Sequence, residues 1–388
     1  MNIRTITHLR RALYTITFIY TTNFALTLYI NSSFLGQYLT AERVSVLFSV
    51  ASIIAMIFLS QATKLYARIG QRRATQWFLL VNVIAAAILA VTTAAWPIIV
   101  AWILFYCTGI LLRFDLDVYM EKITDNADTG RMRGVFLTIL NLAIFISPFI
   151  AGRIVGDGDN YQLIYFTAAG IATITLLLAT LTLRGIPKVA YVLRPFTSIF
   201  RLALKSGNLR NIIATTFLLE FFYSWMVIYN PLYLHQEIGF DWATIGIILS
   251  TMLLPFVLIE YPLGKIADLW LGEKEILVAG LAITGIATAA IAFITTPSVA
   301  LFAGILFVTR IGAAAVEIMN ETYFFKHVDA EDTGMISLYR VTRPLAYIIG
   351  PLAGALVLAV APFNQLYLIL GVIMLVGIFP AMRIIDTK

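Results

Sequence analysis

The sequence has little charge and few residues that bind metals. Its 388 residues include one cysteine and three histidines, and Asp, Glu, Lys and Arg together make up only 12%. A single cysteine, Cys107, excludes a disulfide within the chain, and the histidines lack the spacing of metal ligands. A P-loop is also missing, which argues against direct use of ATP. We expect no cofactor and no enzymatic activity, because no His/Cys cluster, paired metal ligands or nucleophile motif is present.

Hydrophobic residues take the place of the missing charge. They form 60% of the chain, and the mean hydropathy is +0.90, which lies outside the range of soluble globular proteins. They occur in runs of about twenty residues, the length that crosses ~30 Å of hydrocarbon at ~1.5 Å per residue. We predict twelve membrane-spanning helices, at residues 12–34, 43–63, 76–96, 98–120, 133–155, 161–183, 211–234, 242–263, 276–296, 298–324, 335–360 and 364–382.

The net charge of +6 follows from membrane topology rather than from a nucleic-acid partner. We assign nearly all Lys and Arg residues outside the spans to one side of the membrane, and only Arg43 and Arg153 to the other. This positive-inside pattern places both termini in the cytoplasm. We therefore expect the lipid bilayer and no nucleic acid as a partner. The short loops fit a prokaryotic plasma membrane.

Two segments of ten residues indicate an internal duplication. EKITDNADTG at 121–130 reappears as FKHVDAEDTG at 325–334, a shift of 204 positions (325 − 121). Six spans precede residue 184 and six follow residue 211, so the second copy keeps the orientation of the first. We predict an all-α membrane protein of two parallel-repeat six-helix bundles, residues 1–183 and 211–388.

Residues 184–210 form a basic cytoplasmic linker between the two predicted bundles. Phe196, Ile199, Phe200 and Leu204 recur in it at helical spacing. The pattern fits a short amphipathic helix on the inner membrane surface, or a basic linker with incidental apolar residues.

Two loops at equivalent positions of the repeat share a motif. One reads GKIADLWLGEK at 264–274 and the other TKLYARIGQRR at 63–73. They resemble the G-x-L-A-D-R-x-G-R-K signature of the major facilitator superfamily. One extra residue separates Asp268 from Gly272, and Ala67 and Thr63 replace the Asp and the first Gly in the other loop. Together with the span count and the parallel duplication, the resemblance covers the whole chain. It implies a monomeric transporter in which one bundle rocks against the other.

The resemblance also implies a cytoplasmic gate at these two loops. A glycine permits a sharp turn between helices, and a carboxylate caps the N-terminus of a facing helix. Asp268 would then meet the start of span five, and the basic residues of the other loop would meet the start of span eleven. The alternative is that these charges are simply solvated. The gate candidates are Gly264, Asp268, Gly272, Arg68, Gly70, Arg72 and Arg73.

Ionisable residues inside the spans are candidates for proton coupling or substrate binding, because charge is costly there. Span ten carries Arg310, Glu317 and Glu321 on one face, and span four carries Arg113 and Asp117. The two glutamates lie at the depths of Arg343 and Arg340 in span eleven, which favours structural ion pairs among these four residues. For Arg113 and Asp117 the structural and the functional interpretation are equally open.

Glu220 in span seven is the leading candidate for proton coupling. Its own helix carries no basic residue nearby, and aromatic residues surround it in the sequence. A carboxyl group in such a place can load and release a proton during alternating access. Arg310 is a possible partner, and that pairing would argue for a structural role. By the resemblance, spans one, four, seven and ten line a central cavity, which adds the candidates Asn23, Tyr223, Trp225, Tyr229 and Asn230.

We therefore expect a secondary transporter that moves a small-molecule substrate with protons. The buried acids and the aromatic residues near Glu220 favour export of a cationic or amphipathic drug-like solute. The stretch typical of drug–proton antiporters is degenerate here, with Ser147-Pro148 in span five, which weakens antiport. The alternatives are a symporter that imports a sugar or other polar metabolite, an organic-anion carrier, and a non-transporting membrane sensor with the same fold.

Overall fold

A computed structural model describes residues 3–122, 129–184, 206–267, 272–294, 296–327 and 333–385, and it contains helices and no strand within these ranges. Eleven segments in them are long and apolar enough to cross a membrane. The chain is therefore a multi-pass, all-helical membrane protein. The predicted amphipathic helix in the linker and the gate residue Asp268 lie outside the described residues.

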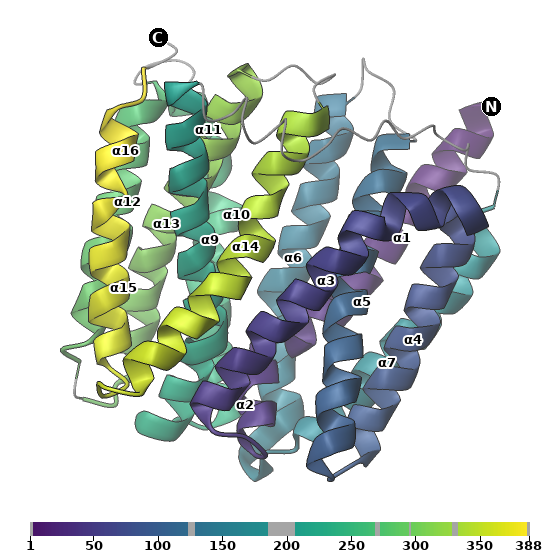
Figure 1. Cartoon of the computed structure of the whole chain (residues 1–388), viewed down its shortest axis with the longest axis horizontal. Coiled ribbons are helices and arrows are strands. Elements are labelled where there is room, and N and C mark those ends of the chain that lie inside the picture. Colours follow the sequence, from purple (N-terminus) through teal and green to yellow (C-terminus); the bar gives the residue numbers. More distant parts are fainter. Residues whose placement is uncertain are drawn as a thin grey trace. The chain divides into compact units, whose positions relative to one another are not determined.

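The helices begin and end near the predicted spans (Figure 1). In the first half they are α1 (Ile3–Leu28), α2 (Asn31–Gly36), α3 (Ala41–Ile69), α4 (Gln71–Val91), α5 (Ala95–Lys122), α6 (Thr129–Val155), the 3-10 turn η1 (Gly156–Gly158) and α7 (Tyr161–Thr182). In the second half they are α9 (Gly207–Leu232), the π-helical turn η2 (Tyr233–Glu237), α10 (Trp242–Leu258), α11 (Glu260–Ile266), α12 (Glu273–Ile291), α13 (Val299–His327), α14 (Thr333–Leu358), α15 (Gln365–Val376) and α16 (Ile378–Met382).

The first predicted span, residues 12–34, is not among the eleven apolar segments. It is divided between α1 and α2. Polar residues lower its hydropathy, and four of them are buried inside the protein, namely Thr17, Thr21, Asn23 and Thr27. These side chains face the interior of the protein and not the lipid, as buried polar residues of other helices also do.

The described helices group into two units, each with its own packing. Unit 1 lies within Met1–Tyr38, Val50–Tyr191 and Asp241–Gly246, and unit 2 within Leu39–Ser49, Val192–Phe240 and Ile247–Lys388. In unit 1, α4 packs against α5 and α7, while α1 packs against α6 and α7. In unit 2, α12 packs against α13 and α15, while α14 packs against α9. The domain boundaries at residues 183 and 211 remain predictions from the sequence.

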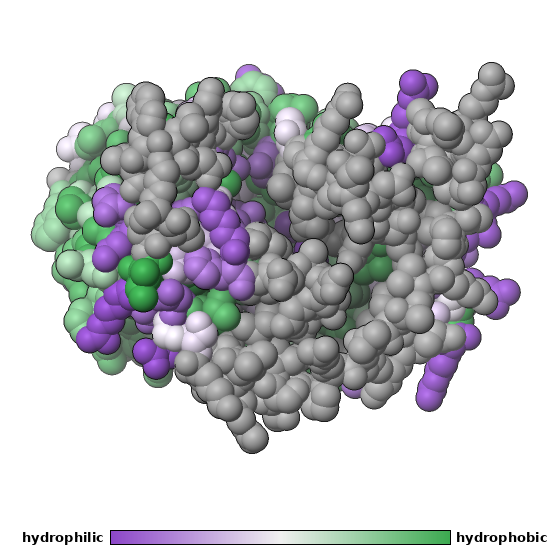
Figure 2. All heavy atoms as spheres, turned by 90° about the horizontal axis from the view of Figure 1, so that it is seen from above, coloured by the Kyte–Doolittle hydropathy of each residue, from purple (hydrophilic) through white to green (hydrophobic). Residues whose placement is uncertain are grey.

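The outward surfaces of the helices are apolar. Exposed residues include Phe166, Leu177 and Leu181 on α7, and Ile286 on α12. Figure 2, which looks onto one end of the helices, shows hydrophilic residues gathered at that end beside hydrophobic residues of the left flank. Large exposed apolar surfaces are rare on soluble monomers, and here they fit contact with lipid chains.

Candidate functional site

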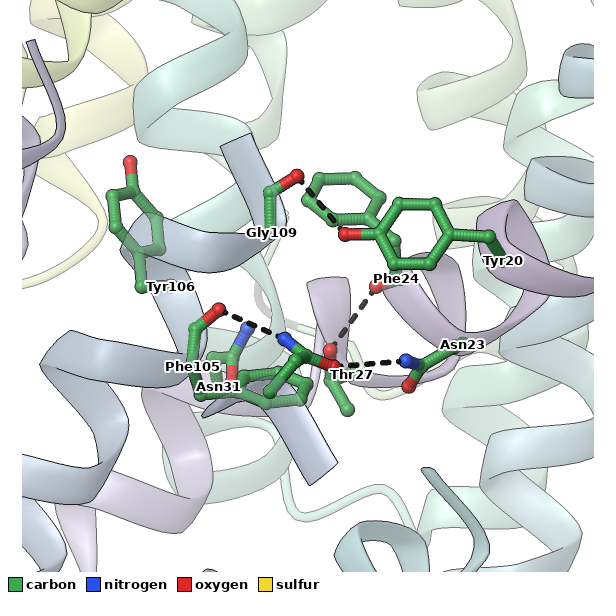
Figure 3. Close-up of a pocket in the computed structure, with 9 residues that line it drawn as sticks. Tyr20, Asn23, Phe24, Thr27, Asn31, Phe105, Tyr106 and Gly109 are labelled. Atoms are coloured by element: carbon green, nitrogen blue, oxygen red, sulfur yellow. Dashed lines mark hydrogen bonds between the residues drawn. The ribbon is translucent and has the colours of Figure 1, made fainter. Parts of the chain in front are cut away.

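A small pocket in unit 1 lies where α1 and α2 meet α4 and α5 (Figure 3). It has room for about one water molecule. The lining residues carry no charge and combine amides with aromatic rings. They are Tyr20, Asn23, Phe24, Thr27, Asn31, Asn82, Phe105, Tyr106 and Gly109.

Two amides in this pocket are hydrogen-bonded to each other. Nδ2 of Asn23 on α1 donates to Oδ1 of Asn82 on α4 at 3.2 Å. Nδ2 of Asn82 donates in turn to the carbonyl oxygen of Phe105 at 3.3 Å and to Oγ1 of Thr108 at 2.9 Å. Oδ1 of Asn23 is buried and has no hydrogen-bond partner within the described residues. The sequence marked Asn23 as a cavity residue, and the structure adds Asn82.

Other polar groups around the pocket are already satisfied. Oδ1 of Asn31 accepts from Nε1 of Trp102 at 3.0 Å and from the hydroxyl of Tyr165 at 2.8 Å. The hydroxyl of Tyr20 donates to the carbonyl oxygen of Gly109 at 3.0 Å. These bonds hold the pocket walls together, because each joins two different helices.

Arg113 lies at the edge of the same pocket. Its guanidinium carbon is 4.7 Å from the centre of the Phe24 ring, and Phe24 is one of the lining residues. Asp117 belongs to the same helix, α5, but its side chain lies outside the described part, so the predicted pairing with Arg113 stays a prediction. The contact that the structure describes for Arg113 is a cation–π contact.

Asp115 on α5 was not a candidate in the sequence analysis, and it is fully buried. Its Oδ1 accepts from Nε2 of Gln71 at 2.9 Å, and Oδ2 accepts from the hydroxyl of Thr75. The hydroxyl of Thr75 also lies 3.0 Å from that of Tyr119. A carboxyl inside an apolar run was the available signal. These contacts join the first two turns of α4 to α5 within unit 1.

Glu220 on α9 forms an ion pair with Arg343 on α14. Its Oε2 lies 3.6 Å from Nε of Arg343, and the two side chains are 17% and 44% exposed. The sequence analysis named Arg310 as the possible partner of Glu220 and placed Arg343 with the glutamates of span ten. The structure thus describes Arg343 as a partner of Glu220, while the other predicted pairings stay predictions.

Tyr223 on α9 connects two other candidates on α13. Its hydroxyl donates to Oε2 of Glu317 at 2.5 Å. The guanidinium carbon of Arg310 lies 5.8 Å from the centre of the Tyr223 ring and 4.8 Å from that of Phe222. Arg310 is 1% exposed, and its Nη1 has no hydrogen-bond partner in the described structure. Glu321 lies one turn after Glu317 and is exposed.

The remaining candidates of span seven make contacts that pack α9 against its neighbours in unit 2. Nε1 of Trp225 donates to the carbonyl oxygen of Gly350 at 2.6 Å, and the hydroxyl of Tyr229 donates to that of Pro351 at 2.9 Å. Oδ1 of Asn230 accepts from the hydroxyl of Tyr367 at 3.0 Å. All three candidates are buried.

The two gate loops turn on equivalent glycines. Gly70 precedes α4 with φ of 84°, and Gly272 precedes α12 with φ of 80°. Both values lie in the region that a side chain disfavours, which is why glycine stands at these positions. The two positions are 202 residues apart (272 − 70), in register with the repeat. Gly264 lies in α11, between Glu260 and Ile266.

The charged residues near these turns contact their own unit. Nη2 of Arg72 donates to the carbonyl oxygen of Thr180 near the end of α7 at 2.8 Å, while Arg68 and Arg73 are exposed. After Gly272, the buried Glu273 pairs with Lys326 of the duplicated segment at 2.6 Å. Arg340 is exposed on α14. A gate function for these residues stays a prediction.

The part of the chain that the structure describes holds no group of three or more His, Cys, Asp or Glu residues that could bind a metal ion.

Comparisons with known proteins agree on the fold. A mutant of the nucleoside transporter NupG superposes with a TM-score of 0.77 at 16% identity, covering 96% of this chain and 99% of that one. A POT family transporter in complex with 5-aminolevulinic acid gives 0.76 at 15% identity, covering 97% and 95%. A bacterial homologue of the human lysosomal transporter Spinster, inward-facing and unoccupied, gives 0.70 at 12% identity, covering 98% and 94%.

At these identities the structural matches show the fold alone. No curated protein is similar enough in sequence to count as a match. The family model described as Major Facilitator Superfamily matches residues 13–248 and 212–387, which together span almost the whole chain. The chain therefore belongs to the major facilitator superfamily and is a transporter rather than an enzyme.

Proposed function

We propose that the protein is a proton-coupled secondary transporter that imports a small, uncharged polar solute, with Glu220 as the proton-binding residue. The observation that carries the proposal is the ion pair between Glu220 and Arg343. The pair joins α9 to α14 inside unit 2, at a depth where water does not fully screen charge.

Protonation of Glu220 would change the contact between these two helices. A neutral carboxyl group loses its Coulomb attraction to Arg343. The packing of α9 against α14 is thereby linked to the binding of one proton. A transporter needs such a link, because a gradient does work only if proton binding favours one conformation over another.

The contacts in unit 2 argue against a cationic solute as the first choice. Glu220 already lies beside Arg343, and Glu317 accepts a hydrogen bond from Tyr223, whose ring faces Arg310. The acids that favoured a cation therefore have positive charge or a hydroxyl donor near them. The pocket of unit 1 offers amides and aromatic rings without charge, which suits an uncharged polar solute.

An uncharged polar solute favours import by proton symport over export. Proton symport concentrates a nutrient from a dilute medium, whereas the antiporter stretch in span five is degenerate at Ser147 and Pro148. In the structure the hydroxyl of Ser147 donates to the carbonyl oxygen of Ala143 within its own helix. The protein is expected to work as a monomer in the plasma membrane.

Proton flux in proteoliposomes tests the proposal. The wild type is reconstituted with an internal pH dye, a proton gradient is imposed, and sugars, nucleosides, organic cations and organic anions are added in turn. Glu220→Gln keeps the shape of the side chain and removes its charge. Glu237→Gln is the matched control, because Glu237 is exposed at the end of η2.

We expect an uncharged solute to move protons through the wild type and Glu237→Gln but not through Glu220→Gln. Transport by Glu220→Gln with unchanged pH dependence would overturn the role of Glu220. Proton movement with organic cations alone would overturn the solute class and restore the export hypothesis.

A further inference from the structure

We propose that the Asn23–Asn82 pair in unit 1 is a subsite that binds one hydrogen-bond donor of the solute, a hydroxyl or an uncharged N–H group. This inference rests on the proposed function and narrows its substrate class. The observation behind it is the buried Oδ1 of Asn23, which lines the pocket and has no hydrogen-bond partner in the described residues (Figure 3).

The surrounding bonds determine which end of the Asn23 amide is open. Thr108 donates its hydroxyl hydrogen to a backbone carbonyl, of Leu104 or Phe105, so its oxygen acts as an acceptor toward Asn82. Nδ2 of Asn82 uses both of its hydrogens, on Thr108 and on the carbonyl oxygen of Phe105. Asn82 must therefore turn its Oδ1 toward Asn23.

This orientation is passed on to Asn23. Because Asn82 presents an acceptor, Asn23 must present its NH₂ group to it, at 3.2 Å. The oxygen of Asn23 is then the atom left over in the pocket. Backbone carbonyl groups of α5 can only accept hydrogen bonds, and they thereby determine the orientation of both amides. The open group in the pocket is therefore an acceptor, which needs a donor.

The charge near the pocket determines which kind of donor fits. The lining residues are uncharged, and the guanidinium group of Arg113 lies 4.7 Å from the centre of the Phe24 ring. An ammonium group would be repelled by Arg113 and would meet no carboxylate among the lining residues. A hydroxyl or amide N–H carries no such cost.

The size of the pocket limits what enters it. With room for about one water molecule, it accepts a single functional group and not a whole solute. The subsite therefore distinguishes a solute with a donor at one position from an analogue that lacks it. A buried acceptor left unsatisfied weakens binding of the analogue, which is the physical basis of the discrimination.

The test measures binding by the purified full-length protein, without a proton gradient. Isothermal titration uses D-glucose, uridine and their deoxy analogues as uncharged probes and tetraphenylphosphonium as a cationic probe. Asn23→Leu removes the open acceptor. The double variant Asn23→Leu/Asn82→Leu removes both amides, so that neither is left as a buried orphan. Thr22→Val is the control, because Thr22 precedes Asn23 on α1, is not among the lining residues and donates its hydroxyl only to the carbonyl oxygen of Phe18 on the same helix.

We expect one uncharged probe to bind the wild type and Thr22→Val alike, and to bind both Asn23 variants roughly tenfold more weakly. Its deoxy analogue, lacking the relevant hydroxyl, should bind the wild type more weakly and be insensitive to the substitution. Equal affinity of the Asn23 variants for every bound probe would overturn the subsite and leave a pocket that holds only water.

Binding of the cation alone would also overturn the subsite. The coupling role of Glu220 is judged separately, from proton flux, because the binding measurement involves no gradient. If Glu220→Gln abolishes proton flux while the Asn23 variants bind every probe normally, the subsite fails and the proposed function stands. If the Asn23 variants lose affinity while Glu220→Gln keeps its proton flux, the role of Glu220 fails and the subsite stands.

Discussion

At the scale of single residues, the environment of Arg310 shows how the protein keeps a charge inside a helix bundle. The side chain is almost fully buried, and the rings of Phe222 and Tyr223 face its guanidinium group. Aromatic faces offset part of the cost of taking a cation out of water. The same Tyr223 donates its hydroxyl to Glu317, so one aromatic residue serves both charges.

Asp241, between η2 and α10, provides a pH-dependent helix cap outside the spans. Its carboxylate accepts from the backbone N–H of Thr244 at 2.8 Å and from the hydroxyl of Thr244 at 2.7 Å. These bonds hold the pKa of Asp241 below its usual value. Since the folded pKa is lowered, the cap stabilises α10 above the unfolded pKa of about 3.9 and loses its effect as the pH falls through the folded value.

We predict that Asp241→Ala lowers the free energy of unfolding by about 0.5–2 kcal/mol at neutral pH. The measurement is the melting temperature in detergent from pH 7 down to pH 3. The difference from the wild type should shrink below about pH 4, as Asp241 becomes protonated in the wild type. Asp241→Asn is the control, because Asn also caps helices and does not titrate. A difference that is constant over the whole pH range would contradict the prediction.

At the scale of helices, packing in unit 2 depends on small residues. Gly280 on α12 and Gly312 on α13 face each other, and a Cβ added at Gly312 would lie 2.5 Å from the carbonyl oxygen of Gly280. Backbone atoms at that distance cannot move aside as a flexible side chain can. Small residues let helices approach closely in membranes, where van der Waals contact and not the hydrophobic effect holds helices together.

We predict that Gly312→Leu separates α12 from α13 and lowers the yield of folded, monodisperse protein, with a cost of about 3 kcal/mol or more. The measurement is size-exclusion chromatography in detergent together with the melting temperature. Gly304→Ala on the same helix is the control, since a Cβ there meets no atom within 4 Å. It should leave the protein unchanged or slightly more stable, because Ala favours a helix over Gly. Equal behaviour of the two variants would show that α12 and α13 are not in close contact.

At the scale of the whole molecule, the duplicated halves share backbone turns but differ in the polar contacts beside them. Gly70 and Gly272 both have positive φ, and each precedes a long helix. The residue after the first is Gln71, which bonds to Asp115, whereas the residue after the second is Glu273, which pairs with Lys326. The turn needs a glycine at both places, while a polar contact can be built with different partners.

The distribution of Lys and Arg predicts which loops face the cytoplasm and which face the outside. Cys107 is the only cysteine and is buried, so an impermeant maleimide should label the wild type weakly. Thr296 lies between α12 and α13, at the end that the positive-inside pattern places outside, and Arg184 lies at the start of the predicted cytoplasmic linker; both positions are exposed. We expect Thr296→Cys to be labelled in intact cells and Arg184→Cys only after permeabilisation, as the positive-inside rule requires. The reverse pattern would invert the topology.

The sequence by itself determined the fold class, because span length, hydropathy and loop charge are local properties that the bilayer selects. The glycines of the two turns were also predictable, since their motif and register are visible in the chain. The first span was predicted as well, although its buried polar residues lower its hydropathy and keep it out of the eleven apolar segments.

Only the tertiary structure decided which polar residues meet. The ion pair between Glu220 and Arg343 joins two helices that lie far apart in the sequence, and depth along a helix did not predict it. The partner of Asn23 was likewise undetectable, since Asn82 lies 59 residues away on another helix. The length of a hydrophobic span can be read from the local sequence. The pairing of side chains depends on how the helices are rotated and packed, which no local sequence pattern determines.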